Sequence, residues 1–394
     1  MSHTSLTVYG ATWCSDCKRA KKFLGEQRVH YEWVDVEQNA TGLALVEMVN
    51  KGKRIIPTIV FHDDNSTLVE PTNAELASKL GLQTRARMNY YDLICIGGGP
   101  ASLTAALYAA REGLDVLVIE KSGLGGQAGV TERLDNFPGF PDGINGGEFA
   151  DRLVQQARRF NVELLQAQEV IGLRDEEESK YVTTADGNEY GARAILIATG
   201  SKYRRLGVPG EDDLIGAGIH FCATCDGPFY KGQHVAVVGG GNSAGEESLF
   251  LTRFADKVTI LVRGPEMTAS KIVIDKVTMS PKIEVRYNTQ VKELHGEAKL
   301  SGVTVLDTVK NATEEIHPKG MFVFIGLQPN TGWLPAEIKR DKTGFIMTKP
   351  NLETDMPGVF AAGDCRLGST KQAASAVGEG ATAALMVREY LKTI

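Results

Sequence analysis

The sequence predicts an α/β protein in which a small N-terminal domain precedes two larger, Rossmann-like, three-layer domains. Two observations predict this class. Short β-type runs alternate with apolar residues at helical spacing along the chain, and two glycine-rich turns each stand between a strand and a helix. A length of 394 residues agrees with two to three domains.

The composition is that of an ordinary soluble globular protein, with 42% hydrophobic and 23% charged residues. A net charge of −6 and the lack of a long basic run argue against nucleic acid as a partner. Residues 1–4 show no cationic stretch before an apolar core, and no apolar run approaches the ~20 residues of a membrane-spanning helix. We therefore expect a cytoplasmic protein that does not contact membranes.

Four of the six cysteines form two Cys-x-x-Cys pairs, Cys14 with Cys17 and Cys222 with Cys225. In a chain without a secretory signal, such pairs indicate redox or metal chemistry. A shared zinc site is disfavoured, because the pairs are far apart and neither has a His or Cys nearby at ligand spacing. We expect no metal, and we expect Cys95 and Cys365 to be buried packing residues.

The first 82 residues follow a β-α-β-α-β order. Strands are expected over 6–9, 31–36 and 59–61, and a helix over 40–50. Another helix is expected to begin at Cys14, where free N–H groups and the helix dipole favour a thiolate.

The first glycine-rich turn, Gly97-Gly98-Gly99-Pro100-Ala101-Ser102, follows an apolar strand over 91–96 and opens a helix. Gly97 permits the tight turn, and Gly99 lets a pyrophosphate approach the backbone. The next strand ends in Glu120, which is placed to accept a hydrogen bond from a ribose hydroxyl. This arrangement predicts a dinucleotide site.

The second turn, Gly239-Gly240-Gly241-Asn242-Ser243-Ala244, follows a strand over 235–238. The strand after it, over 258–262, ends without an acidic residue, and Arg263 comes next. The missing carboxylate argues against a dedicated NADH site, and an arginine there can meet a 2′-phosphate.

Residues 5–82 resemble the glutaredoxins, most closely the mycoredoxin branch. The resemblance rests on Trp13-Cys14-x-x-Cys17, Val34-Asp35-Val36-Glu37 and Ile56-Pro57-Thr58. It implies that Cys14 is the nucleophile, that Cys17 is the resolving thiol, and that Trp13, Ile56 and Pro57 contact the substrate. Ser15-Asp16 between the cysteines departs from the family. A carboxylate there opposes thiolate formation, and Lys18 and Arg19 partly offset it.

Residues 90–394 resemble the low-molecular-weight thioredoxin reductases. The resemblance implies a homodimer that binds FAD and NAD(P)H, with the NAD(P)H domain inserted into the FAD domain. The expected organisation is a glutaredoxin-like domain over 1–82, a linker over 83–89, an FAD domain over 90–206 and 329–394, and an NAD(P)H domain over 207–328. The motifs that carry the resemblance are the two glycine-rich turns, Gly125-Gly126-Gln127, Ala198-Thr199-Gly200, Cys222-Ala223-Thr224-Cys225-Asp226 and Gly363-Asp364.

The same resemblance assigns roles to individual residues. Cys225 is expected to face the flavin, Cys222 to be the interchange thiol, and Asp226 to be the acid/base. FAD contacts are expected from Gly97, Gly99, Pro100, Ala101, Glu120, Gly126, Gln127, Asn136, Ala198, Thr199, Gly200, Gly363, Asp364, Gln372 and Ala373. NAD(P)H contacts are expected from Gly239, Gly241, Asn242, Ser243 and Arg263.

Two departures from the thioredoxin reductase pattern concern the cofactors. Only Arg263 remains of the family's arginine cluster, so the sequence leans towards NADPH and leaves NADH open. Lys371 stands where the family usually has arginine. In addition, the segments 325–331 and 363–365 resemble the flavoprotein subunit of alkyl hydroperoxide reductase.

The predicted function is a flavin-dependent disulfide reductase. Electrons are expected to pass from NAD(P)H through FAD and Cys222/Cys225 to Cys14/Cys17, and then to a thioredoxin- or glutaredoxin-type, peroxiredoxin or small-thiol disulfide. Because Cys225 cannot touch the flavin while Cys222 serves another domain, we expect the NAD(P)H domain to swivel. Two alternatives are a peroxiredoxin reductase and a scaffold whose N-terminal domain binds an iron–sulfur cluster.

Overall fold

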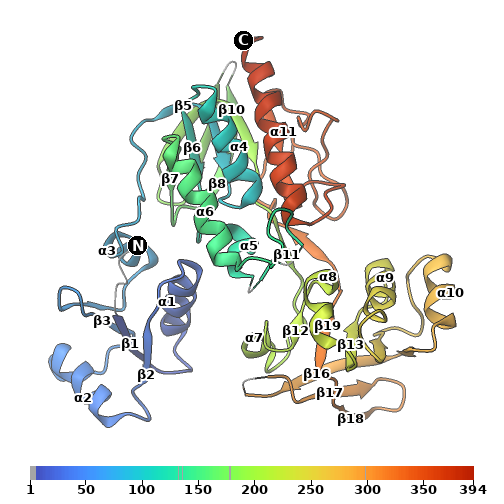
Figure 1. The fold of residues 1–394 in the computed structure, drawn as a ribbon. Helices are drawn as coiled ribbons and strands as arrows, with labels where there is room; N and C mark the ends of the chain where they lie inside the picture. Colours follow the sequence, from blue (N-terminus) through green and yellow to red (C-terminus); the bar gives the residue numbers. More distant parts are fainter. Residues whose placement is uncertain (1–5, 132, 135, 177–178, 298) are drawn as a thin grey trace. The chain divides into compact units, whose positions relative to one another are not determined.

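The computed structural model describes residues 6–131, 133–134, 136–176, 179–297 and 299–394, without the side chains of Thr224 and Cys225. The chain forms two compact units (Figure 1). The first comprises residues 1–131, 137–200 and 329–394, and the second comprises 132–136 and 201–328. Within the described ranges, every helix is too short or too polar to cross a bilayer.

The N-terminal domain, within the first unit, is a four-stranded sheet in the order β2-β1-β3-β4. Strand β1 is parallel to β2 and antiparallel to β3. Apolar residues of α1 and α3 pack on one face of the sheet, and α2 contributes to a second cluster that contains both cysteines of the first pair. The elements are β1 (Leu6–Gly10), α1 (Ser15–Glu26), β2 (Glu32–Asp35), α2 (Ala40–Val49), β3 (Thr58–Phe61), β4 (Ser66–Val69) and α3 (Asn73–Lys79).

Strand β4 and helix α3 were not expected from the sequence. Helix α3 begins with a capping box, in which the Thr72 side chain accepts from the Glu75 N–H and the Glu75 side chain accepts from the Thr72 N–H. Strand β4 pairs antiparallel with β3 and completes the sheet.

The first Rossmann-like domain fills the rest of the first unit. Its sheet has the order β7-β6-β5-β10-β9-β8, and β21 pairs with β10. Helices α4, α6 and α11 pack on one face (Figure 1), and apolar residues of the 333–356 segment cover the other. The elements are β5 (Tyr90–Ile96), α4 (Pro100–Arg111), β6 (Val116–Ile119), α5 (Gly126–Val130), α6 (Gly146–Arg159), β7 (Glu163–Leu165), β8 (Val170–Glu176), β9 (Ser179–Thr184), β10 (Glu189–Ile197), β21 (Val359–Ala361), η2 (Gly363–Cys365) and α11 (Ala373–Leu391).

The segment 83–89, expected as a linker, contains no helix or strand. It is nevertheless held to β7. A Glu163 carboxylate oxygen accepts from Gln83 Nε2 at 2.5 Å and from the Arg87 N–H at 2.6 Å. The Gln166 N–H donates to the Gln83 carbonyl at 2.8 Å. Gln83 and Arg87 of the linker are therefore bonded to β7 and to the residue that follows it.

The second unit is built on a parallel five-stranded sheet in the order β12-β19-β13-β14-β15. Helices α9 and α10 cover one face, and the antiparallel sheet β16-β17-β18 packs on the other. The elements are α7 (Glu211–Leu214), β12 (Ile219–His220), α8 (Ala223–Asp226), η1 (Gly227–Tyr230), β13 (His234–Val238), α9 (Asn242–Leu251), β14 (Lys257–Leu261), α10 (Lys271–Met279), β15 (Ile283–Arg286), β16 (Thr289–His295), β17 (Gly302–Asp307), β18 (Ala312–Ile316) and β19 (Gly320–Val323).

Two of the places where the chain passes between the units form a two-stranded ribbon of β11 (Ser201–Tyr203) and β20 (Leu327–Pro329), and the others flank the 132–136 segment. Further hydrogen bonds extend the pairing at both ends. The Arg204 N–H donates to the Gly326 carbonyl, and the Asn330 N–H donates to the Gly200 carbonyl, each at 3.0 Å. The two crossings at 200–201 and 328–329 are thus hydrogen-bonded to each other.

Candidate active site

The first dithiol lies at the start of α1. Cys14 is the N-cap, and its Sγ accepts a hydrogen bond from the Cys17 N–H at 3.1 Å. A sulfur that receives a backbone N–H at a helix N-terminus is stabilised as a thiolate. Cys17 is only 1% exposed, and burial raises its pKa to about 12. The pair therefore consists of a sulfur that accepts a backbone N–H at the helix start and a buried thiol that stays protonated at neutral pH.

The predicted substrate residues surround Cys14. Its Sγ lies 3.7 Å from the Ile56 carbonyl oxygen, and the Ile56–Pro57 peptide is cis. Trp13 is 64% exposed, and its indole and the Arg54 guanidinium hydrogen-bond Glu37 and hold the pKa of that carboxyl below its usual value. Ile56 and Pro57 are buried next to an exposed aromatic ring, so an incoming chain would meet Trp13 first.

Asp16, the carboxylate inside the first Cys-x-x-Cys, has a partner. Its Oδ1 lies 3.2 Å from Arg19 Nη2, one helical turn away. Arg19 also donates to the Pro71 carbonyl at 2.9 Å, which holds the guanidinium in place. The paired cation offsets the repulsion that Asp16 alone would exert on a thiolate at Cys14.

The first glycine-rich turn fits a bound pyrophosphate. Gly97 has a φ of 104°, and a Cβ there would collide with the Ala198 carbonyl. Gly99 caps α4, Pro100 is the first helical residue, and a Cβ on Gly99 would meet no atom within 4 Å. The open space therefore lies where the helix N–H groups are free to bind an anion.

Glu120 is held by the same turn. The carboxylate is 7% exposed and accepts from the Gly98 N–H at 2.5 Å and from the Ser122 N–H and hydroxyl at 2.7 and 2.8 Å. These bonds fix an acidic group beside the open turn, as a ribose-binding acid requires.

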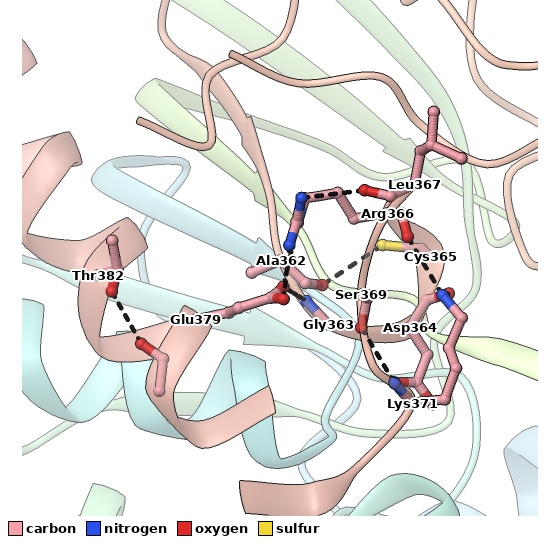
Figure 2. A network of polar contacts seen from close by, with 11 residues as sticks. Ala362, Gly363, Asp364, Cys365, Arg366, Leu367, Ser369, Lys371, Glu379 and Thr382 are labelled. Atoms are coloured by element: carbon pink, nitrogen blue, oxygen red, sulfur yellow. Dashed lines mark hydrogen bonds and ion pairs between the residues drawn. The ribbon is translucent and has the colours of Figure 1, made fainter. Parts of the chain in front are cut away.

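A polar network at Gly363 forms the second part of the expected flavin site (Figure 2). Glu379 of α11 accepts from the Gly363 N–H at 2.7 Å and from Arg366 Nη2 and Nε at 2.6 and 3.2 Å. Both partners of this ion pair are largely buried, with side chains 18% and 15% exposed. The network fixes the turn that presents Gly363 and Asp364.

Lys371 closes this turn from the other side (Figure 2). Its Nζ donates to the Asp364 and Arg366 carbonyls at 2.9 and 3.1 Å and lies 4.3 Å from the centre of the Phe345 ring. Burial raises the pKa of Asp364 and lowers that of Lys371. The lysine that replaces the expected arginine is thus folded against the backbone.

The remaining predicted flavin residues lie at the ends of elements. The Thr199 hydroxyl donates to the Asn330 carbonyl at 2.9 Å, in the loop after β10. Asn136 belongs to the 132–136 segment, which groups with the second unit. Gly126 and Gln127 begin α5, Gln372 caps α11, Ala373 is its first residue, Ala101 lies in α4, and Ala198 and Gly200 flank Thr199.

The second glycine-rich turn repeats the geometry of the first. Gly239 has a φ of 145°, and a Cβ there would collide with the Phe324 carbonyl. Gly241 caps α9, and its added Cβ would find no atom nearer than Thr268 Oγ1 at 3.9 Å. Asn242 Oδ1 accepts from the Ser270 N–H at 2.6 Å. The turn is open for a second dinucleotide, with exposed Ser243 beside it.

The second cysteine pair lies at the short helix α8 of the second unit, with Cys222 directly before the helix and Cys225 within it. Cys222 is disulfide-bonded, whereas the side chain of Cys225 is outside the described part. The Asp226 N–H donates to the Cys222 carbonyl at 3.1 Å, so Asp226 closes the turn that carries the pair. A His220 ring nitrogen, Nδ1, lies 3.4 Å from Asp226 Oδ1. Sequence reasoning missed His220, and its only signal was its place two residues before Cys222.

The family follows from comparison with known proteins. Residues 91–380 match the family model described as pyridine nucleotide-disulphide oxidoreductase. The chain belongs to this family. Residues 6–65 match the glutaredoxin family model in addition.

Relatives of this pyridine nucleotide-disulphide oxidoreductase include thioredoxin reductases. That of Treponema pallidum is 39% identical over 304 residues (77% of this chain and 98% of the relative), and that of Bacillus subtilis is 41% identical over 307 residues (77% and 96%). The crystal structure of the Streptococcus pyogenes thioredoxin reductase has a TM-score of 0.73 at 39% identity and covers 78% of this chain and 99% of that one. The structure of the Giardia duodenalis thioredoxin reductase has a TM-score of 0.72 at 32% identity, and the match covers 77% of this chain and 100% of that one.

These matches confirm the predicted fold class and the predicted enzyme class. The chain is an FAD-dependent NAD(P)H disulfide oxidoreductase with an N-terminal glutaredoxin domain. The roles of single residues and the domain boundaries remain predictions.

Proposed function

We propose that this reductase passes electrons from its central pair, Cys222 and Cys225, to its own glutaredoxin pair, Cys14 and Cys17, and then to a thioredoxin-type disulfide. The observation that carries the proposal is the asymmetry of the first pair: Cys14 receives a backbone N–H, while burial keeps Cys17 protonated. A nucleophile beside a protonated resolving thiol is what disulfide exchange requires. The relatives at about 40% identity are thioredoxin reductases, which favours a thioredoxin-type acceptor.

FAD, when bound, accepts a hydride from the reduced nicotinamide and supplies two electrons to a disulfide. The protein positions it with the α4 N-terminus, Glu120 and the Gly363 turn. When the Cys222–Cys225 disulfide opens, one sulfur leaves as a thiolate, and Asp226 is the nearby acid that can protonate it. The NAD(P)H domain is proposed to swivel between a pose in which the flavin reduces this pair and a pose in which the pair reduces Cys14 and Cys17.

The exchange step follows from the geometry of the first pair. A Cys222 thiolate attacks Cys14 Sγ, the Cys14–Cys17 bond breaks, and Cys17 leaves as a thiolate that takes up a proton readily because of its raised pKa. Cys225 then attacks Cys222, re-forms the central disulfide and releases Cys14. The Cys14 thiolate attacks the substrate disulfide, and Cys17 resolves the mixed disulfide that results.

Two variants test the relay. Cys222→Ser should keep flavin reduction by NAD(P)H and lose reduction of any disulfide substrate. Cys14→Ser should keep reduction of the central pair and lose turnover with the protein substrate. Full turnover of Cys14→Ser with oxidised thioredoxin, glutaredoxin and peroxiredoxin would show that the N-terminal domain is outside the relay.

We also propose a preference for NADPH over NADH. Arg263 is exposed just after β14, and the neighbouring cation Arg286 is already paired with Glu314. Arg263 is therefore available for a 2′-phosphate. Arg263→Ala should raise KM for NADPH about tenfold, a loss in the range of one charge-assisted hydrogen bond, without changing KM for NADH. The matched exposed arginine, Arg253→Ala, should change neither, and equal effects on both nucleotides would contradict the preference.

A homodimer and a cytoplasmic location complete the proposal, as the family resemblance implies. Light scattering of the purified holoprotein tests the dimer, and fractionation of the source cells tests the location.

A further inference from the structure

A buried histidine connects the two ends of the segment that carries the central dithiol. His220 is the last residue of β12, lies two positions before Cys222, and is 8% exposed. Its Nδ1 lies 3.4 Å from Asp226 Oδ1, and its Nε2 lies 2.6 Å from the Tyr230 hydroxyl. One ring thus contacts α8 through one nitrogen and η1 through the other.

The ring has little freedom to turn. It packs at 5.4 Å against the Tyr230 ring and at 5.3 Å against the Phe322 ring of β19, measured between ring centres. Tyr230 itself lies 5.6 Å from Phe322. A Cβ on Gly320 would collide with the Tyr230 ring, so glycine is needed for this packing.

Three side chains, each from a different element, face the His220 ring. From α8 it meets the carboxyl of Asp226, from η1 the hydroxyl of Tyr230, and from β19 the uncharged Phe322. Burial, and then the charge of Asp226, raise the pKa of Tyr230 to about 12, so its hydroxyl stays protonated. In the tautomer with the proton on Nδ1, that N–H lies beside the Asp226 carboxyl, and the lone pair of Nε2 accepts the Tyr230 O–H.

We propose that His220, held by Tyr230, is a positioning residue that aims the carboxyl of Asp226 at the Cys222 pair for proton transfer. The inference rests on the proposed role of Asp226 and adds how that carboxyl is oriented. Asp226 is the residue that gives a proton to the sulfur released when the disulfide accepts two electrons, and takes it back when the thiol is reoxidised. His220 exchanges no electrons and contacts Asp226 rather than the sulfurs.

The experiment compares variants of the full-length holoprotein. Flavin reduction by NADPH reports the step before the dithiol, and turnover with a chromogenic aromatic disulfide reports the dithiol, each measured across a pH series. His220→Ala should lower turnover about tenfold, a part of the ~10²-fold loss expected for Asp226→Asn. Tyr230→Phe, which removes only the hydroxyl, should lower it about fivefold, the equivalent of one hydrogen bond.

His220→Asn separates the positioning role from misfolding, because the asparagine amide can place an N–H near the position of Nδ1. It should recover part of the turnover lost in His220→Ala. All three variants should displace the pH profile of turnover while flavin reduction stays at the wild-type rate. The matched control is His234→Asn, a partly buried histidine of the same unit whose Nε2 bonds Thr259 at 2.9 Å, and it should leave both readouts unchanged.

An unshifted pH profile in His220→Asn and Tyr230→Phe would overturn the inference, as would an equal loss in flavin reduction. If Asp226→Asn turns over normally, the role proposed for Asp226 fails first. If Asp226→Asn is slow while the His220 and Tyr230 variants match the wild type, only the present inference fails.

Discussion

Removing the carboxylate of Glu379 tests how the Gly363 turn is held. Glu379 takes three hydrogen bonds, two from Arg366 and one from the Gly363 N–H. In Glu379→Ala the guanidinium and the amide both lose their acceptor in a largely buried place. In Glu379→Gln the shape of the side chain is kept, but its charge is lost, and the amide N–H₂ faces an N–H donor of Gly363 or Arg366.

The magnitude follows from burial. Breaking a buried ion pair by removing one partner costs about 3–5 kcal/mol. The side chains here keep 18% and 15% exposure, so we take the lower end, about 3 kcal/mol, for Glu379→Ala. Glu379→Gln keeps one acceptor and should cost about 1–2 kcal/mol. At roughly 2–4 °C per kcal/mol for a domain of this size, the alanine variant should unfold about 6–12 °C lower.

The assay is the temperature at which flavin fluorescence appears as the holoprotein is heated. The matched control is Glu389→Ala in the same helix, whose partners Arg388 and Lys392 lie on the surface and whose side chain is 49% exposed. Surface pairs contribute little, so this variant should shift the midpoint by less than about 2 °C. The reasoning is refuted if Glu379→Ala shifts the midpoint no more than Glu389→Ala does.

Three further predictions concern the sites. The valine side chain of Gly99→Val would fill open space at an unstrained backbone, so the apoprotein should melt within ~2 °C of the wild type. The Kd for FAD should rise at least about tenfold, because the side chain occupies the space expected for the pyrophosphate. An unchanged Kd in a fluorescence titration would place the pyrophosphate elsewhere. Because the Cys17 pKa is raised to about 12, iodoacetamide at pH 8 should label Cys14 and spare Cys17 in mass spectra of the reduced protein, and equal labelling would contradict the assignment. Burial raises the pKa of Asp364 in the folded state, so the charged carboxylate lowers stability above that pKa and has no effect below the pKa of the unfolded chain. Asp364→Asn should therefore raise the melting temperature of the apoprotein at pH 8 and not at pH 4. An equal gain at both pH values would exclude an effect of ionisation.

The pattern of neighbouring residues was enough to predict much of the fold. The two strand–glycine–helix units and the helix beginning at Cys14 depend on neighbouring residues, and the structure has them. Helix α3 was not predicted, because it is seven residues long and its apolar residues are too few to show a helical period. The predicted burial of Cys95 and Cys365 is confirmed, since both are fully buried.

The polar contacts of the sites were not predictable in the same way. Glu379 reaches Gly363 across 16 positions, and the partners of His220 lie 6 and 10 positions away on elements of other types. Nothing in residue spacing distinguishes these side chains from surface glutamates and histidines. Only the packing of α11 on the sheet, and of η1 on β19, brings them to their partners.

The paired ribbon of β11 and β20 has a mechanical consequence. Strands that are hydrogen-bonded to each other must bend together, so the swivel proposed above would bend the ribbon as one piece. Gly200 and Gly326, both with positive φ at the ends of the ribbon, are the residues there whose backbone is least restricted by a side chain. For the proposed swivel, a disulfide engineered across this ribbon should therefore leave turnover largely unchanged, whereas replacing either glycine by a β-branched residue should lower it.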